Sequence, residues 1–321
     1  MNPERPLITN KTELRFFGSL GLFLIVLILL SLIVTGKFEK KELTNELTKI
    51  ENKNPFDSIK INAKAAYVYD VRNQKVLFEK NSKERLPLAS VTKVMTAVVA
   101  SDIAPMDQII TITPEAIRAE GDSGLSAGER WTLRNLLDFS LTSSSNDGAK
   151  AIAIGLGAHT TTNPNVETAE NDFINSMNLK ASELGMLNTY FFNETGLDET
   201  NKKSGAYGSA EDMSKMFTYI LRAHPNLLEA TTHQKLNLYS EDNKLHTAIN
   251  TDKIVALIPG IKGSKTGFTD IAGGNLVIAF DPELGRPIII SVLGSTMTER
   301  FNDVSKLVTA TLKEISIDRQ K

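Results

Sequence analysis

Strand patterns lie at the two ends of the chain's body, and helical patterns fill the stretch between them. Residues 65–70 and 76–79 predict a hairpin that turns through residues 72–74. Three more segments, rich in Val and Ile, predict strands: 260–268, 275–280 and 287–293. Residues 108–113 give a short strand signal that ends at Pro114. Helical patterns cover residues 132–141, 148–156, 168–184, 209–222 and 298–315. We therefore expect one sheet made from both chain ends, with an all-helical insertion at about residues 104–255.

Composition excludes several classes of function. The 321 residues suffice for one large domain or two small ones. A net charge of −2 and the lack of a basic, aromatic-interleaved patch give no reason to expect a nucleic-acid partner. Cysteine is absent, which excludes disulfides and thiolate metal sites. The four histidines form no His-x-x-x-His pair, so we expect no metal and no cofactor.

An apolar segment without a charge runs from Phe16 to Gly36. Its length of roughly 20 residues suffices for a helix that spans a bilayer. Residues 34–36 (Val-Thr-Gly) match the small-residue signal-peptide cleavage site poorly, so we expect an uncleaved signal anchor. Basic residues lie on both sides of the segment, and the positive-inside rule only weakly favours a cytoplasmic N-terminus.

These features divide the chain into four predicted parts. Residues 1–15 form a cytoplasmic tail and residues 16–36 the transmembrane anchor. Residues 37–62 are polar and charged and are predicted to form a stalk that holds the body off the membrane. The body then covers residues 63–321.

A serine and a lysine lie three residues apart at the start of a predicted buried helix. The stretch is Leu-Ala-Ser-Val-Thr-Lys-Val-Met-Thr-Ala, residues 88–97, and Pro87 precedes it. The spacing places Ser90 and Lys93 on one helix face. A buried lysine that becomes neutral can take the hydroxyl proton and activate the serine as a nucleophile. An ordinary helix start, with a capping serine and a solvated lysine, is the alternative for this pair alone.

Two further motifs supply partners for this pair. Ser144-x-Asn146 lies at a polar break between two predicted helices, and Lys265-Thr266-Gly267 lies on a predicted strand. Ser144 could relay a proton to a leaving amine, and Asn146 could hold the substrate amide or orient Lys93. The second lysine and Thr266 would present a charge and a hydroxyl to a substrate carboxylate. Gly267 would let an extended substrate lie against the strand.

The lysines and the backbone complete the predicted site. Burial and the charge of Lys265 would both lower the pKa of Lys93, and the two amines would titrate as a coupled pair. The backbone N–H groups of Ser90 and Phe268 would stabilise a developing oxyanion. Ser176-x-Asn178 also fits the second motif, but it lies inside a helical pattern, so Ser144 is the better candidate.

The three motifs together resemble the penicillin-binding proteins and serine β-lactamases. Over about residues 63–315 the chain resembles the D-alanyl-D-alanine carboxypeptidases of the S11 serine peptidase family. Further stretches carry the likeness: Gly121-Asp122-Ser123, Asn193-Glu194-Thr195-Gly196-Leu197-Asp198, Ser209-Ala210-Glu211-Asp212-Met213 and Gly263-Ser264-Lys265-Thr266-Gly267-Phe268-Thr269.

The resemblance implies both a fold and an activity. The fold is an α/β fold of the α+β type, the penicillin-recognising serine transpeptidase/β-lactamase-like fold. It has an antiparallel sheet flanked by helices, plus a helical subdomain. The implied activity is removal of the terminal D-alanine from peptidoglycan stem peptides through an acyl-enzyme on Ser90. Acylation by β-lactam antibiotics is implied too. The implied location is the cytoplasmic membrane of a bacterium, with a single span and the catalytic domain outside.

Two features depart from the family pattern. Phe268 follows the Lys-Thr-Gly motif where some relatives carry His, which leaves the oxyanion role of its backbone intact but puts substrate preference in doubt. Many relatives add a small C-terminal β-domain and an amphipathic membrane tail. The chain ends soon after its closing helix, so we expect neither, and the N-terminal span would serve as the anchor.

Three alternative functions stay open. A β-lactamase would need a second base, and Glu167 with Asn171 has the required spacing, but the pair opens a polar helical pattern and is interpreted as a chance match. A D,D-endopeptidase that cuts peptidoglycan cross-links would use the same residues. A membrane-tethered module that only binds cell-wall peptide would not need a buried nucleophile–base pair.

Overall fold

The computed structural model describes residues 27, 30–31, 33, 54–157 and 165–319. The chain divides into two units, Met1–Asp57 and Ser58–Lys321, and the second contains all the described strands and the helices α2–α7. Among the described residues, no helix is both long and apolar enough to cross a bilayer. The anchor predicted over residues 16–36 lies outside the described residues, except for positions 27, 30, 31 and 33.

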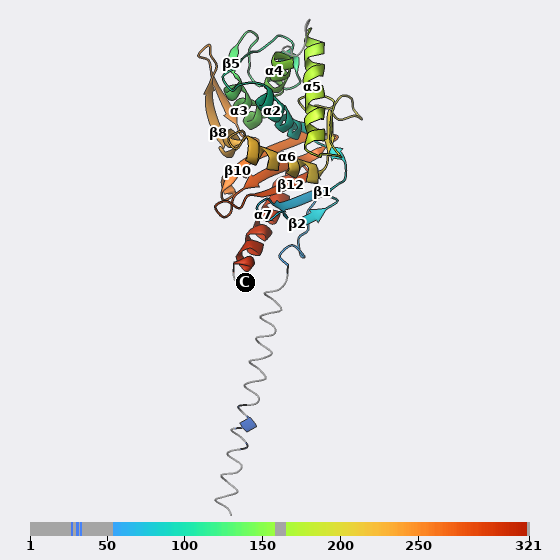
Figure 1. The fold of residues 1–321 in the computed structure, drawn as a ribbon, viewed down its shortest axis with the longest axis vertical. Helices are drawn as coiled ribbons and strands as arrows, with labels where there is room; N and C mark the ends of the chain where they lie inside the picture. The colour runs from blue at the N-terminus through green and yellow to red at the C-terminus, as the bar shows by residue number, and fades with distance from the viewer. Residues whose placement is uncertain (1–26, 28–29, 32, 34–53, 158–164, 320–321) are drawn as a thin grey trace, which may run out of the picture. The chain divides into compact units, whose positions relative to one another are not determined.

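The main sheet has five antiparallel strands, in the order β10-β11-β12-β1-β2 (Figure 1). They are β1 (Ala65–Asp70), β2 (Lys75–Lys80), β10 (Ile261–Thr269), β11 (Gly273–Phe280) and β12 (Ile288–Ser295). The hairpin near the start of the unit joins the C-terminal strands because β1 pairs with β12, with Ala65 opposite Leu293. The predicted sheet built from both chain ends is confirmed.

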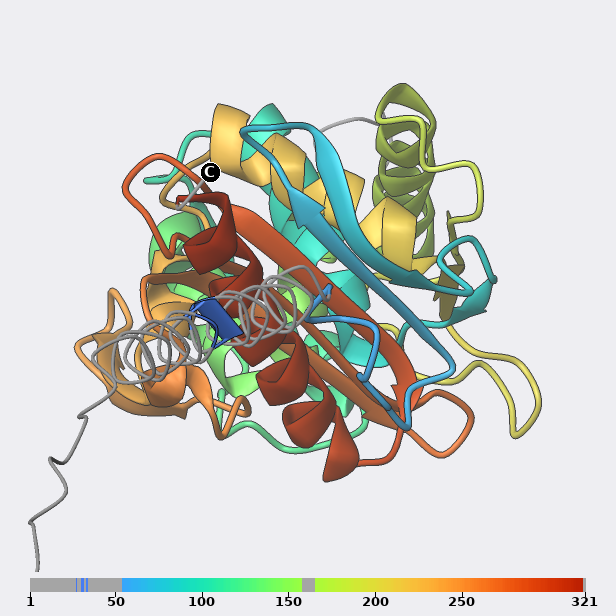
Figure 2. The same ribbon diagram turned by 90° about the horizontal axis from the view of Figure 1, so that it is seen from below.

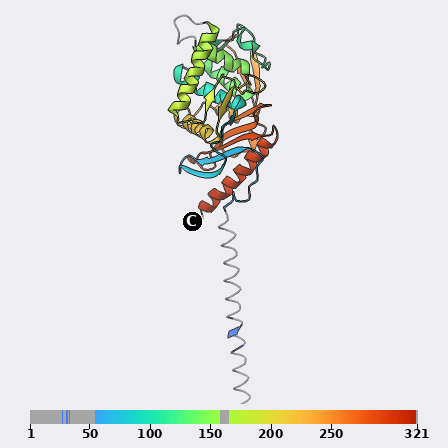
Figure 3. The same ribbon diagram turned by 90° about the vertical axis from the view of Figure 1, so that its right-hand side faces the viewer.

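Helices cover both faces of this sheet. Figures 1 and 2 place α7 (Glu299–Asp318) on one face and α6 (Ala210–Ala223) with the remaining helices on the other. Figure 3 shows the same layers from the side. Seven of the eight residues of β12 are buried, as expected for a strand that is covered on both faces. The helix α6 begins where the side chain of Ser209 caps it, accepting a hydrogen bond from Asp212 N.

Four helices lie beyond the sheet: α2 (Thr92–Ile103), α3 (Leu133–Ser143), α4 (Asn146–Gly157) and α5 (Val166–Glu183). Every residue of α2 from Thr92 to Ala100 is buried, so the helix that follows Ser90 runs through the interior. Apart from Lys93, the residues from Thr92 to Ala100 are apolar or carry a small hydroxyl side chain, which agrees with their burial on all sides.

The insertion predicted to be all-helical contains short strands, of which only the one at the strand signal of residues 108–113 was predicted. They are β4 (Ile109–Thr111) with β5 (Arg130–Thr132), β6 (Tyr190–Phe191) with β7 (Ala206–Gly208), and β8 (Lys235–Tyr239) with β9 (Leu245–Ile249). The short strand β3 (Leu86–Pro87) pairs with β7. These strands have two to five residues each, too few for a clear alternation of apolar and polar positions. Their pairing is therefore a property of the tertiary structure.

The end of the predicted stalk packs against the body. The carboxylate of Asp303 on α7 accepts hydrogen bonds of 2.9 Å from both Asn62 N and Ala63 N. Lys80 Nζ donates to the carbonyls of Ile61 and Ala63. Residues 61 and 62 therefore pack with the body, a little before its predicted start at residue 63.

Candidate active site

Ser90 lies in a 3₁₀ turn, η1 (Ala89–Val91), directly before α2. A side chain from the sheet fixes the backbone that leads into this turn: Asn275 Nδ2 of β11 donates hydrogen bonds of 2.9 Å to the carbonyls of Pro87 and Leu88. Ala89 adopts the left-handed conformation, with φ of 47°, which is unfavourable for a residue with a side chain. The strained backbone puts the half-buried Ser90 hydroxyl at the head of a buried helix.

Lys93 is buried, and its amine contacts three oxygen atoms. Nζ lies 3.0 Å from Ser90 Oγ, 2.6 Å from Asn146 Oδ1 and 2.8 Å from the carbonyl of Thr195. Burial lowers the pKa of this lysine to about 7, against a smaller opposite effect of the negative charge of Glu194. A large fraction of the amine is therefore neutral near pH 7, which is what a base acting on Ser90 requires.

Ser144 and Asn146 lie at the junction between α3 and α4. Ser144 terminates α3 in the left-handed conformation with φ of 65°, and α4 begins two residues later. Asn146 Nδ2 donates a hydrogen bond of 2.6 Å to the carbonyl of Glu120, so its Oδ1 faces Lys93. The junction thereby directs one side chain to each of the two lysines, because Ser144 contacts Lys265.

Lys265 is buried on β10 and donates a hydrogen bond of 2.9 Å to Ser144 Oγ. Its second contact, also 2.9 Å, is the carbonyl of Thr266. Burial first, and then the charges of Lys93 and Arg300, lower its pKa well below the usual value for lysine. Ser144 and Lys265, from different elements, therefore meet, and the charge of Lys93 contributes to the lowered pKa of Lys265. For Lys93 itself burial is the cause of the lowered pKa.

Thr266 and Gly267 follow Lys265 along β10 and make contacts of their own. The hydroxyl of Thr266 lies 2.5 Å from that of Thr251. A Cβ atom added to Gly267 would lie 2.6 Å from the carbonyl oxygen of Leu88 and 3.2 Å from Ser90 N. A glycine is required here because β10 packs against the backbone that carries Ser90, a reason different from the predicted room for substrate.

The backbone N–H groups of Ser90 and Phe268 stay a predicted oxyanion hole. The close approach of β10 to the η1 turn brings these two chain segments together, since Phe268 follows Gly267 directly. β10 is the edge strand of the main sheet, so its other edge is free of sheet partners in the described part of the chain. An extended peptide can add to such an edge.

Sequence reasoning missed several groups that complete the site. Arg300 reaches from α7 and donates a hydrogen bond of 2.7 Å to the carbonyl of Gly267. The carbonyls of Thr195 and Glu120 hold Lys93 and Asn146, and main-chain groups leave no signal in residue type. The stretch around Thr195 carries a signal only through the family resemblance, whereas nothing in the sequence singles out Arg300.

The competing motif residues lie elsewhere. Ser176 Oγ donates to the carbonyl of Asp172 in its own helix, and Asn178 bonds to the backbone of Phe191. Glu167 and Asn171 are exposed on α5. No hydrogen bond described in the structure links these four residues to Ser90 or Lys93.

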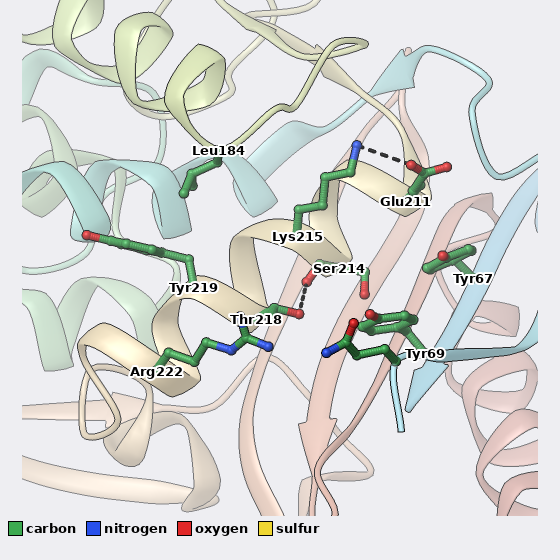
Figure 4. A pocket seen from close by; sticks show the side chains of 10 residues that line it. Tyr67, Tyr69, Leu184, Glu211, Ser214, Lys215, Thr218, Tyr219 and Arg222 are labelled. Atoms are coloured by element: carbon green, nitrogen blue, oxygen red, sulfur yellow. Dashed lines mark hydrogen bonds and ion pairs between the residues drawn. The ribbon is translucent and has the colours of Figure 1, made fainter. Parts of the chain in front are cut away.

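The cavity between β1 and α6 lies apart from the candidate site. It has a volume of about 430 Å³ and is lined by residues that include Tyr69, Glu211 and Arg222. Figure 4 shows these side chains. None of the candidate site residues lines it. Within the described parts of the chain, no cluster of three or more His, Asp or Glu side chains is arranged to hold a metal ion.

Comparison with known proteins gives consistent matches. A family model described as D-alanyl-D-alanine carboxypeptidase, peptidase S11, matches residues 49–297. The chain is 31% identical over 252 residues to the D-alanyl-D-alanine carboxypeptidase DacF of Bacillus subtilis, covering 77% of this chain and 61% of the relative. It is 32% identical over 219 residues to a D-alanyl-D-alanine endopeptidase of Pseudomonas aeruginosa, covering 67% and 66%. The chain thus spans less than two thirds of the length of these two relatives.

Solved structures agree on the fold. The ampicillin-bound penicillin-binding protein D2 of Listeria monocytogenes has a TM-score of 0.64 at 27% identity, over 79% of this chain and 98% of that one. A Streptomyces K15 DD-transpeptidase variant has a TM-score of 0.69 at 24% identity, over the same shares, and supports the fold alone. With a family model matching more than half of its length, the chain belongs to the S11 family of D-alanyl-D-alanine carboxypeptidases.

Proposed function

We propose that this chain is a serine D-Ala-D-Ala carboxypeptidase that removes the terminal D-alanine of peptidoglycan stem peptides through an acyl-enzyme on Ser90. The observation that carries the proposal is the buried amine of Lys93, 3.0 Å from Ser90 Oγ, with a pKa of about 7. Membership of the S11 family supports the same substrate class.

In the acylation step, neutral Lys93 takes the Ser90 proton while Oγ attacks the carbonyl carbon of the penultimate D-alanine. The backbone N–H groups of Ser90 and Phe268 would stabilise the oxyanion. When the C–N bond breaks, the departing D-alanine amine takes a proton, and Ser144 can relay it from the lysine pair. A water molecule then attacks the acyl carbonyl, Lys93 takes its proton, and the shortened peptide leaves with Ser90 restored.

The terminal carboxylate of the substrate needs a cationic partner. Lys265 and Arg300 lie at the β10 side of the site, and Thr266 adds a hydroxyl nearby. Because a bound carboxylate stabilises the ammonium form, substrate would raise the lowered pKa of Lys265 and charge it on binding. This gives specificity for a free C-terminus.

Acylation by β-lactams belongs to the same proposal, because the antibiotic would place a reactive carbonyl against Ser90. The decisive experiment is mass spectrometry of the intact protein after benzylpenicillin treatment, with the adduct mapped to a peptide. We expect one adduct on the peptide that contains Ser90, lost in Ser90→Ala. Full-length protein that takes no adduct would favour a binding module over an enzyme.

An endopeptidase is the second candidate function, because relatives in Pseudomonas aeruginosa and Escherichia coli carry that name. Both activities would use the same nucleophile and base, and they differ in the group that leaves. Digestion of purified sacculi distinguishes them: free D-alanine indicates the carboxypeptidase, and uncross-linked muropeptides indicate the endopeptidase.

Anchoring by residues 16–36 at the bacterial cytoplasmic membrane, with the catalytic domain outside, is also part of the proposal. The uncharged apolar segment supports it. Protease treatment of intact spheroplasts should remove the catalytic domain and leave a short N-terminal fragment in the membrane. Protection of the domain in spheroplasts would contradict this orientation.

A further inference from the structure

A second cavity, of about 510 Å³, lies on the outer face of the small sheet β3-β7-β6. It is lined by Arg85, Tyr190, Phe192, Lys203 and Tyr207, here called the aromatic-basic pocket. Alternation along the short strands explains its position: Leu86, Phe191 and Ala206 face the core, while their neighbours in sequence face outward.

Three aromatic rings in this pocket contact one another at the surface. Tyr190 is 44% exposed and Phe192 36% exposed. Their ring centroids are 4.8 Å apart, and Tyr207 lies 6.4 Å from Phe192, both in edge-to-face contact. Large exposed aromatic groups that cluster in a cavity usually mark a binding surface.

Two cations flank the rings. Lys203 Nζ lies 3.7 Å from the centre of the Phe192 ring, and Arg85 Nε donates to the carbonyl of Asn188 at 3.1 Å. Neither has an ion pair within the described residues. The carboxylates of Glu199 and Asp198 accept hydrogen bonds from Asn193 and Thr269. The pocket therefore combines aromatic rings with two cations that form no ion pair within the described residues.

The chain connects this pocket directly to the candidate active site. Arg85 is five residues before Ser90, and β3 leads from one to the other. Phe192 is followed by Asn193, whose Oδ1 accepts from Thr195 N and Gly196 N and so fixes the loop that holds Lys93. Five residues of chain span at most roughly 18 Å, so Arg85 and Ser90 lie within that distance, which a peptide of about six extended residues can cover.

We propose that the aromatic-basic pocket binds an acidic segment of the peptide substrate, upstream of its D-Ala-D-Ala end. The inference rests on the proposed function for its substrate. Carboxylates would pair with Arg85 and Lys203, and the aliphatic parts of the peptide would pack on Tyr190 and Phe192. Charge complementarity selects an acidic peptide over a neutral one.

The test compares two synthetic peptides with the same D-Ala-D-Ala end, one neutral and one with upstream glutamates, on the full-length chain. We expect the wild type to have the higher kcat/KM for the acidic peptide. The double variant Arg85→Ala/Lys203→Ala should lose that preference through KM, by roughly two- to fivefold for each cation. Lys202→Ala is the matched control, because this neighbouring lysine lies outside the pocket lining and should keep the preference.

Benzylpenicillin acylation reports on folding and catalysis independently of the pocket, because the antibiotic has no acidic peptide segment upstream of its reactive carbonyl. Its rate should be equal in the wild type and the double variant. The proposal is overturned if the wild type does not discriminate between the peptides, or if the double variant loses the same factor on both. Calorimetry of peptide binding to the Ser90→Ala variant tests the pocket even if the proposed function fails. The acidic peptide should bind this variant more tightly than the neutral peptide does. The proposal would also be contradicted if a glycan fragment without peptide displaced the bound acidic peptide as strongly as unlabelled acidic peptide does.

Discussion

Lys93 donates a hydrogen bond of 2.8 Å to the main-chain carbonyl of Thr195. The oxygen of Asn146, 2.6 Å away, accepts a second hydrogen bond from the same amine. A neutral amine has two N–H groups and one lone pair, so these two acceptors leave the lone pair for the third neighbour, the Ser90 hydroxyl at 3.0 Å. The surroundings of Lys93 therefore fit the form that accepts a proton.

The acylation rate should rise with pH through about 7, because Lys93 must lose its proton before it can act as a base. Burial, the main cause of the lowered pKa, favours the neutral amine. The second-order rate constant for benzylpenicillin, measured from about pH 5 to pH 9, gives the profile. A rate that stays flat across this range, or one that falls as the pH rises, would contradict the role of Lys93.

Glu194→Gln should move this rise to lower pH. The buried carboxyl of Glu194, whose own pKa burial raises to about 7, raises the pKa of Lys93 when it is ionised. Removal of that negative charge lowers the pKa of the lysine, and the shift should be modest because Glu194 is only partly ionised near pH 7. Glu183→Gln, an exposed partner of Lys180, serves as the control and should leave the profile unchanged.

Gly267→Ala should slow acylation by at least an order of magnitude, because the new methyl group would displace the backbone that carries Ser90. The accompanying loss in the free energy of unfolding should be about 1–3 kcal/mol. In Gly155→Ala the new Cβ would lie 3.3 Å from flexible methyl groups of Ile110, so that variant should acylate normally. Equal acylation rates in the two variants would refute the packing explanation for this glycine.

Glu167→Ala should leave the lifetime of the penicilloyl adduct unchanged. The side chain is exposed on α5, away from the Ser90–Lys93 contacts, so it is not placed to activate a water molecule. The adduct can be followed over hours by intact-mass spectrometry. Fast nitrocefin turnover by the wild type that disappears in this variant would instead support the β-lactamase alternative.

Asp70→Ala should destabilise the body by about 3 kcal/mol, because it leaves the buried Arg286 without its 2.8 Å partner. Asp318 and Glu283 also contact this arginine and would offset part of the loss. Thermal unfolding of the full-length chain measures the change in Tm. Asp242→Ala, which breaks the solvent-exposed pair with Arg130, should hardly alter Tm. If the two variants have the same Tm, the buried pair contributes no more to stability than the exposed pair does.

The small strand pairs illustrate what local patterns miss. The hairpin of β1 and β2 was predicted within a residue or two, because each strand has six residues with a clear turn between them. The strands β6 and β7 have two and three residues and pair across an interval of about fifteen positions. Only packing against the rest of the fold stabilises such short pairs, and their outer face carries the aromatic-basic pocket.

By itself, the sequence determined the helices and long strands and the three motifs, because periodicity and residue type act over short spans. It also indicated that Ser90 and Lys93 share one helix face, which follows from their spacing of three. Only the tertiary structure brought Lys265 to Ser144, 121 positions away, and the carbonyl of Thr195 to Lys93. The tertiary structure also explains why residue 267 is a glycine, because β10 packs there against the backbone that carries Ser90. Such contacts between distant segments depend on how the sheet and helices pack.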